Sequence, residues 1–141
     1  MKKVVLSLGG SLIIPDEIRV GFLKEFRDLI ISRLDEYQFV IFTGLNSLFV
    51  ALMEHAKFKD LDFTKLRITL SGGMALMESV AEDWHKATGC VVSEGYGMTE
   101  ASPVVSMNPI GFQKIGSAGI PIPGTEIKVV DEQGVEQQVG G

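Results

Sequence analysis

The chain of 141 residues has a single cysteine, no long apolar run and no excess of basic residues. The one cysteine, Cys90, excludes an internal disulfide and suits a reducing compartment, so we expect a cytoplasmic protein. The apolar run Val4–Leu8 is too short for a signal peptide, and no segment is long enough to span a bilayer. A formal net charge of −5 argues against nucleic acid or a membrane surface as a binding partner.

The composition that remains is that of one folded domain. Apolar residues make up 45% of the chain and charged residues 22%, which is ordinary for a globular protein. A chain of this length can bury a sizeable apolar core. We therefore expect residues 1–141 to form a single α/β domain.

Three stretches have the periodicity of amphipathic helices. The first follows Pro15, and its apolar stripe consists of Phe22, Phe26, Ile30 and Leu34, with Leu23 and Leu29 beside them. The second is expected to begin with Asn46 or Ser47 as a helix cap. The third runs from about Met74 to Thr88, where Gly89 ends it.

Four short apolar runs between these helices have the character of buried strands: Val4–Leu8, Phe39–Phe42, Arg67–Leu70 and Cys90–Ser93. The alternation predicts an α/β fold, a layered βαβ sandwich with a mostly parallel sheet. We expect Phe39–Phe42 to pair with Val4–Leu8, and Arg67–Leu70 to join the same sheet. A half-exposed run at Glu126–Val130, followed by a turn at Asp131–Gly134, leaves room for a C-terminal antiparallel strand or hairpin.

Each predicted strand ends in a turn that contains glycine: Gly9-Gly10-Ser11, Gly44, Ser71-Gly72-Gly73 and Gly95–Glu100. The carboxyl ends of parallel strands meet at one edge of a sheet, and ligands of such sheets bind there. We expect the backbone N–H groups of these turns to converge at that edge, where they would suit a phosphate. The alternative is that the glycines serve only to close tight turns.

The stretch Gly95–Pro103 is the strongest candidate for a binding site. Tyr96 offers a face for a purine ring, while Thr99 and Glu100 supply hard oxygen atoms for a phosphate and its magnesium ion. Glu100 is the candidate metal ligand, and a single carboxylate makes a weak site without phosphates. The alternative is a tight loop in which Thr99 and Glu100 cap a helix.

Five stretches match one known family in order: Thr43–Phe49, Leu70–Met74, Gly95–Pro103, Ser106–Pro109 and Gly116–Gly124. On these stretches the chain, from Thr43 to about Gly134, resembles the long-chain fatty-acid–CoA ligases of the adenylate-forming superfamily. The resemblance implies binding of ATP or AMP with magnesium. It assigns an adenine pocket to Gly72, Gly73, Tyr96 and Gly97, and phosphate and magnesium binding to Thr99 and Glu100.

The first part of the chain resembles a different family. Val4–Pro15, with its turn Gly9-Gly10-Ser11, is similar to the N-terminus of an archaeal-type uridylate kinase of the amino-acid-kinase family. The resemblance implies that this turn sits against a transferred phosphate. Many members carry a lysine two residues before the glycines; here that position is Ser7, as in the archaeal uridylate kinases. The resemblance stops at about Thr43, because Leu45-Asn46-Ser47 stands where further glycines are expected.

The two resemblances meet between Gln38 and Gly44, at a strand that ends in Thr-Gly in both families. No linker separates them, although natural fusions join whole domains through linkers. We therefore interpret the chain as an engineered or selected chimera of a kinase-like segment, residues 1–43, and a ligase-like segment, residues 44–141. Chance similarity over the first segment is the alternative.

Neither resemblance comes with a complete active site. The lysines and phosphate loop that would stabilise transition-state charge are missing from the chain, so we expect no catalytic residues and no ligase or uridylate-kinase activity. The first hypothesis is a catalytically incomplete domain that binds nucleotide weakly at most. The second is a truncated but functional ATP-dependent fatty-acid–CoA ligase module that needs a partner chain. Two chains could also exchange elements to form a homodimer.

Overall fold

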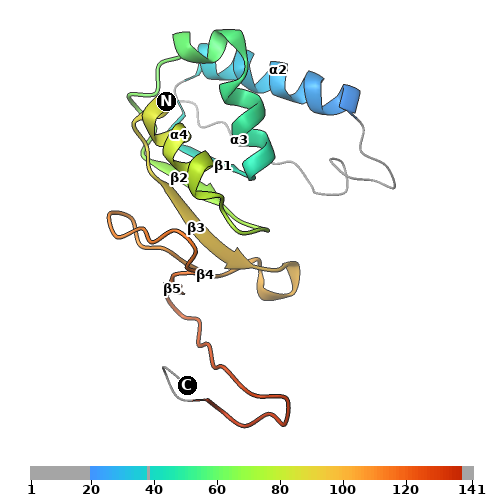
Figure 1. Ribbon diagram of the computed structural model, residues 1–141, viewed down its shortest axis with the longest axis vertical. Helices are drawn as coiled ribbons and strands as arrows, with labels where there is room; N and C mark the ends of the chain where they lie inside the picture. Colours follow the sequence, from blue (N-terminus) through green and yellow to red (C-terminus); the bar gives the residue numbers. More distant parts are fainter. Residues whose placement is uncertain (1–19, 38, 138–141) are drawn as a thin grey trace.

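Helices and strands alternate along the computed structural model, which describes residues 20–37 and 39–137 (Figure 1). The helices are α2 (Val20–Glu36), α3 (Asn46–Met53) and α4 (Glu78–Thr88), with short 3₁₀ segments η1 (Ala56–Asp60) and η2 (Thr99–Ala101). The strands are β1 (Ile41–Gly44), β2 (Ile68–Ser71), β3 (Val92–Gly97), β4 (Val104–Met107) and β5 (Ile120–Pro121). Within the described ranges, no helix is both long and apolar enough to cross a membrane.

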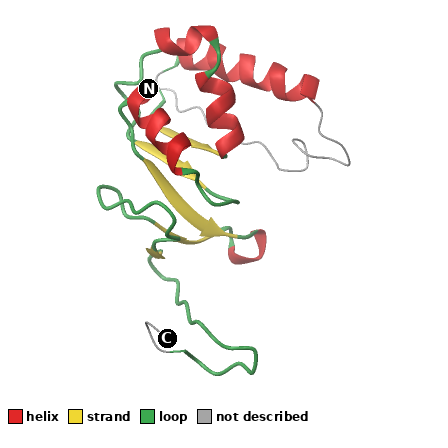
Figure 2. Cartoon of the chain, viewed as in Figure 1, coloured by secondary structure: helices red, strands yellow, loops and turns green. Residues whose placement is uncertain are grey.

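Within the described residues the strands, which are yellow in Figure 2, form one five-stranded sheet in the order β1-β2-β3-β4-β5. β1, β2 and β3 are parallel, with Phe42 opposite Thr69, and β4 and β5 extend the sheet in antiparallel fashion. The predicted α/β class and mostly parallel sheet are confirmed, and the antiparallel strands are β4 and β5 rather than the run Glu126–Val130. The pairing of β1 with β2 also confirms that Arg67–Leu70 joins the sheet of Phe39–Phe42, whereas Val4–Leu8 lies outside the described residues.

Trp84 of α4 lies at the centre of the core between the helices and the parallel strands. The centroid of its ring is 4.7 Å from that of Phe49 in α3 and 5.6 Å from that of Phe42 in β1. Its indole N–H donates a hydrogen bond to Thr69 Oγ1 of β2 over 3.1 Å, so both buried polar groups have a partner. Other buried residues of this core come from every layer and include Ile30, Ile31, Leu34, Leu52, Phe58, Val80, Ala81 and Val92.

The buried face of α2 differs in part from the predicted stripe. Ile30 and Leu34 are buried as predicted, but Ile31 is buried as well and Leu29 is 41% exposed. Successive residues of an α-helix are rotated by about 100°, so a face centred between Ile30 and Ile31 turns Leu29 to the outside.

Helix α4 begins at Glu78 rather than at the predicted Met74. The segment before it is held by side chains from elsewhere in the fold, which bind the Ala75 carbonyl oxygen and the N–H groups of Leu76 and Met77. The end of the helix is as predicted: Gly89 adopts the left-handed conformation, with φ 73°, that glycine adopts without strain.

The predicted cap of α3 is wrong. The N-cap residue is Leu45, which makes no side-chain capping bond, and Asn46 is the first residue inside the helix. Ser47, the other predicted cap, lies within the helix and is exposed. The side chain of Asn46 is used instead to hold the loop before α4, as described below.

Strand β3 is longer than the predicted Cys90–Ser93. It starts at Val92 and continues to Gly97 because Gly95 and Tyr96 pair with the antiparallel strand β4. Part of the stretch expected to be a loop is therefore strand.

The C-terminal segment is more open than predicted. The run Glu126–Val130 is not a strand, and its pairing is a single antiparallel bridge between Val130 and Glu136. The turn at Asp131–Gly134 is confirmed, since the Gly134 N–H donates to the Asp131 carbonyl oxygen over 3.0 Å.

Candidate functional site

Three of the four predicted glycine turns lie at the carboxyl ends of the adjacent strands β1, β2 and β3 (Figure 1). Gly44 of β1 is opposite Ser71 of β2. A Cβ atom added to Gly72 would lie 3.3 Å from the carbonyl oxygen of Gly95, so the exit of β2 contacts β3. The fourth turn, Gly9-Gly10-Ser11, lies outside the described residues.

Glycine is required at two positions of this edge for different reasons. Gly73 has φ 87°, in the left-handed region that strains other residues. At Gly97 the reason is close approach: an added Cβ would lie 1.9 Å from the carbonyl oxygen of Pro103. This contact sits where the pairing of β3 with β4 shifts register, between Tyr96 and Gly97.

Beyond the glycines, the candidate ligand-binding side chains face solvent. Tyr96 is 50% exposed, and Thr99 and Glu100 are exposed on η2. The N-cap of η2 is Met98 and no side chain caps it, so the interpretation of Thr99 and Glu100 as a helix cap is wrong. The described part of the chain contains no group of three potential metal ligands.

Glu94 is a buried residue of this region that the sequence analysis missed. Its carboxylate accepts two backbone hydrogen bonds, from the Leu76 N–H over 2.8 Å and from the Gly116 N–H over 2.6 Å. Its side chain thus joins the loop after β2 to the loop after β4. The sequence did contain a signal, since a carboxylate that directly follows the buried residues Val92 and Ser93 needs partners.

Asn46 is the second buried polar residue that the sequence analysis assigned wrongly. From the first turn of α3, its side-chain N–H donates to the Ala75 carbonyl oxygen over 2.9 Å. Its Oδ1 accepts a hydrogen bond from the Met77 N–H over 3.0 Å. Both bonds reach the loop between β2 and α4.

Asn108 organises the loop that follows β4. Its side-chain N–H donates to the Ser117 carbonyl oxygen over 2.6 Å, and its Oδ1 accepts from the Lys114 N–H over 3.0 Å. The same loop passes so close to β4 that a Cβ on Gly119 would lie 2.0 Å from the backbone carbon of Met107. These contacts place the loop against β4, which pairs with the strand that carries Glu94.

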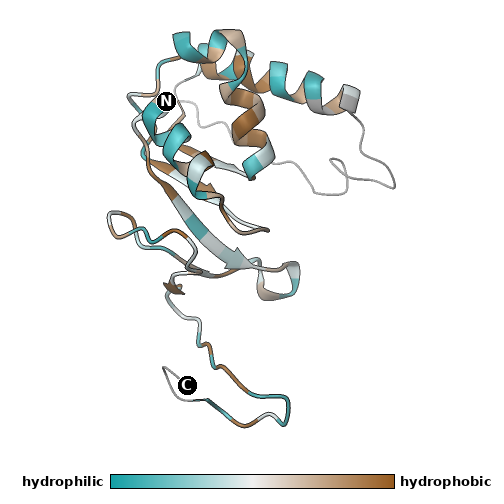
Figure 3. Cartoon of the chain, in the orientation of Figure 1, coloured by the Kyte–Doolittle hydropathy of each residue, from teal (hydrophilic) through white to brown (hydrophobic). Residues whose placement is uncertain are grey.

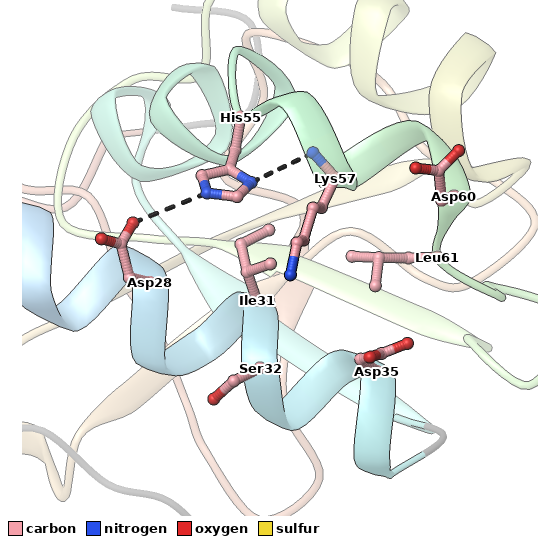
Figure 4. Close-up of a pocket in the computed structure, with 8 residues that line it drawn as sticks. All are labelled: Asp28, Ile31, Ser32, Asp35, His55, Lys57, Asp60 and Leu61. Carbon is pink, nitrogen blue, oxygen red and sulfur yellow. Dashed lines mark hydrogen bonds and ion pairs between the residues drawn. The ribbon is translucent and has the colours of Figure 1, made fainter.

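A cavity of about 450 Å³ lies elsewhere, between α2 and η1 (Figure 4). His55 lies on its wall, where its Nδ1 accepts from the Lys57 N–H over 3.2 Å and its Nε2 lies 3.7 Å from Asp28 Oδ1. The other lining residues are Ile31, Ser32, Asp35, Asp60 and Leu61. His55 follows the last turn of α3, whereas Asn46 begins that helix, so the cavity and the glycine edge lie at opposite ends of α3.

The sequence matches the family model of the AMP-binding enzymes over residues 4–141. It is 42% identical over 139 residues to a long-chain-fatty-acid–CoA ligase of Haemophilus influenzae, with coverage of 96% of this chain and 23% of that ligase. It is 32% identical over 131 residues to a long-chain-fatty-acid–CoA ligase of Bacillus subtilis, with coverage of 89% and 23%. The chain thus spans less than a quarter of the length of these relatives.

Solved structures of CoA ligases have a similar fold. The anthranilate CoA ligase AuaEII, in complex with anthranoyl-AMP, matches with a TM-score of 0.72 and 28% identity, over 82% of this chain and 22% of that one. A benzoate CoA ligase from Burkholderia xenovorans LB400 matches with a TM-score of 0.70 and 30% identity, over 82% and 24%.

The family match runs through the junction that the sequence analysis placed between Gln38 and Gly44. It begins at residue 4 instead of near Thr43, and the comparisons lend no support to a uridylate-kinase segment or to a chimera. Over nearly its whole length, the chain belongs to the family of AMP-binding enzymes.

Proposed function

We propose that the chain is the adenine-nucleotide-binding segment of an AMP-forming long-chain fatty-acid–CoA ligase. The observation that carries the proposal is the contact between the exit of β2 and strand β3, where Gly72 meets Gly95 beside the half-exposed Tyr96. Ligands of α/β sheets bind at such an edge. Of the two functions considered from the sequence, a truncated ligase module accords better with a family match that starts at residue 4.

The residues at this edge fall into two groups, one suited to the adenine ring and one suited to the phosphates. Gly72 and Gly73 leave space for a flat ring to approach the backbone, and Tyr96 supplies an aromatic face for it. The hydroxyl of Thr99 can donate a hydrogen bond to a phosphate oxygen, and the carboxylate of Glu100 can share a magnesium ion with the phosphates. Bound magnesium would neutralise part of the negative charge of the phosphates.

The proposal includes a partner, namely the remainder of a ligase domain, on the same chain or a second one. Short apolar stretches, brown in Figure 3, recur along the C-terminal third of the chain. Those exposed there include Ile110, Phe112, Ile120, Ile127, Val129 and Val135. A large exposed apolar surface marks an interaction site. The chain covers only 23% of the length of the Haemophilus influenzae ligase, so in such a ligase this segment would contact the remaining part of the protein.

The test is the dependence of ATP binding on magnesium. We expect the chain to bind ATP–magnesium with a dissociation constant on the order of a millimolar, equivalent to about 4 kcal/mol. The Glu100→Gln variant should lose the gain in affinity that magnesium provides and keep the affinity for ATP without magnesium, because only the metal contact is removed. Isothermal titration with and without magnesium measures both quantities.

The matched control is Glu25→Gln, which removes an equally exposed carboxylate from α2. It should bind ATP–magnesium like the wild type. The proposal fails if magnesium does not raise the affinity of the wild type, or if the Glu100→Gln variant responds to magnesium as fully as the wild type does.

A further inference from the structure

The loop Gly72–Met77, here called the glycine loop, is held by side chains from two different elements. Asn46 of α3 binds the Ala75 carbonyl oxygen and the Met77 N–H, at 2.9 Å and 3.0 Å. Glu94 of β3 binds the Leu76 N–H between them, at 2.8 Å. Two side chains therefore fix three consecutive residues of the loop. One comes from an element before the loop in the sequence and the other from an element after it.

Both side chains are buried, which makes these bonds costly to lose. Asn46 is 8% exposed and Glu94 is 9% exposed. A buried carboxylate must be satisfied by donors, and Glu94 has two backbone N–H groups, one at each of its oxygen atoms. Removing one partner would leave a buried backbone group without a hydrogen bond.

The second hydrogen bond of the Glu94 carboxylate connects β3 to the loop that follows β4. Its Oε2 accepts from the Gly116 N–H over 2.6 Å, in the loop that Asn108 orders. The backbone carbonyl oxygen of Glu94 also accepts the Asn108 N–H over 2.8 Å. One residue at the end of the buried part of β3 thus ties together the loops on both of its sides, directly before Gly95-Tyr96-Gly97.

We propose that Asn46 and Glu94 are positioning residues that hold the glycine loop against β3 and so set the width of the nucleotide site between Gly72 and Tyr96. The expected effect on nucleotide affinity rests on the proposed function. The position of the loop, in contrast, rests on the hydrogen bonds alone. Neither side chain touches the nucleotide. Both act through the backbone of residues 75–77, which follows Gly72 and Gly73 directly.

The experiment compares Glu94→Gln with the control Thr69→Val in the full 141-residue chain. A glutamine keeps one acceptor oxygen but turns an NH₂ group toward the other backbone N–H. Thr69→Val removes the acceptor of the Trp84 indole in the core, so it lowers overall stability without touching the glycine loop. Amide hydrogen exchange is followed by NMR. The exchange rate of Leu76 is divided by that of Gly89, whose N–H bonds to the His85 carbonyl oxygen at the end of α4.

We expect the Leu76-to-Gly89 ratio, or the Gly116-to-Gly89 ratio where the glutamine oxygen stays at Leu76, to rise at least about tenfold in Glu94→Gln, since local opening raises only the exchange of the released amide. The ratio should be unchanged in Thr69→Val, because global unfolding accelerates both amides alike. The Gly72 and Gly73 amide signals should shift in Glu94→Gln alone. An unchanged ratio and unmoved glycine signals would overturn the inference. If Glu94→Gln does not fold, Asn46→Ala replaces it, because it removes the oxygen that accepts the Met77 N–H, and the Met77-to-Gly89 ratio is the readout.

Nucleotide binding separates this inference from the proposed function. If the wild type binds ATP–magnesium, Glu94→Gln should weaken binding about fivefold or more while Thr69→Val leaves it unchanged; equal affinities in all three proteins would refute a positioning role. If the wild type binds no ATP, the proposed function is wrong, and the exchange ratios and glycine shifts of the free protein alone decide whether Glu94 holds the loop.

Discussion

Replacing Trp84 with alanine is expected to lower the free energy of unfolding by about 3–5 kcal/mol, the cost of deleting a large buried aromatic side chain. Trp84 is 1% exposed, and its ring contacts those of Phe42, Phe49 and Phe58. The cavity would open where α3, α4 and the sheet meet, so neighbouring side chains could fill it only in part. The loss is comparable with the total stability of a small domain, about 5–15 kcal/mol. Urea unfolding followed by circular dichroism measures the change.

Phe112→Ala is the control for Trp84→Ala. Phe112 is a large aromatic residue too, but it is 82% exposed. Its removal should change the free energy of unfolding by less than about 0.5 kcal/mol, as is usual for surface positions. Equal midpoints for Trp84→Ala and Phe112→Ala would contradict the core described above.

Gly97→Ala is expected to damage both the fold and the nucleotide site. The added methyl group would lie 1.9 Å from the Pro103 carbonyl oxygen, which belongs to the backbone and cannot rotate away. Relief requires a shift of β3 against β4, with a cost of about 1–3 kcal/mol for overpacking. Tyr96 would move with β3, so we expect ATP–magnesium binding to fall below detection. Thermal unfolding and isothermal titration measure the two effects.

The control for Gly97→Ala lies two residues earlier in the same strand. A Cβ atom on Gly95 would have its nearest neighbour at 3.5 Å, an ordinary contact. Gly95→Ala should therefore unfold at nearly the temperature of the wild type. The account of β3 is wrong if the two alanine variants have the same stability.

The sequence predicts the parallel half of the fold well because local patterns decide it. Apolar runs, helical periodicity and glycine stops identify β1, β2, α3 and the C-terminal end of α4. The glycine-containing stretches at the carboxyl ends of β1, β2 and β3 lie at one edge because the three strands are adjacent and parallel. This part of the candidate site follows from the order of elements alone.

The rest depends on contacts between residues far apart in the sequence. Gly95-Tyr96-Gly97 has the composition of a loop, and it is strand only because β4 returns beside it. The segment before Glu78 is bonded to Asn46 and Glu94, which lie far from it in the sequence. The residues of that segment alone do not indicate that Asn46 and Glu94 bind it.

The boundary between two resemblances was a misleading signal for a related reason. A strand followed by Thr-Gly occurs at Thr43-Gly44, and such exits are common to unrelated α/β folds. A match that includes such an exit therefore does not distinguish one α/β family from another. The family match over residues 4–141 favours one AMP-binding segment across that point.

An NMR titration of the chain with ATP–magnesium tests whether the glycine edge is a nucleotide site. The account predicts that the amide signals of Gly72, Gly73, Tyr96 and Gly97 shift together with one dissociation constant, on the order of a millimolar. Signals around the cavity between α2 and η1, such as that of Lys57, should stay in place, since that cavity lies at the other end of α3. If saturating nucleotide leaves the four edge signals unmoved, or moves only Lys57 and its neighbours, the glycine edge is not the site.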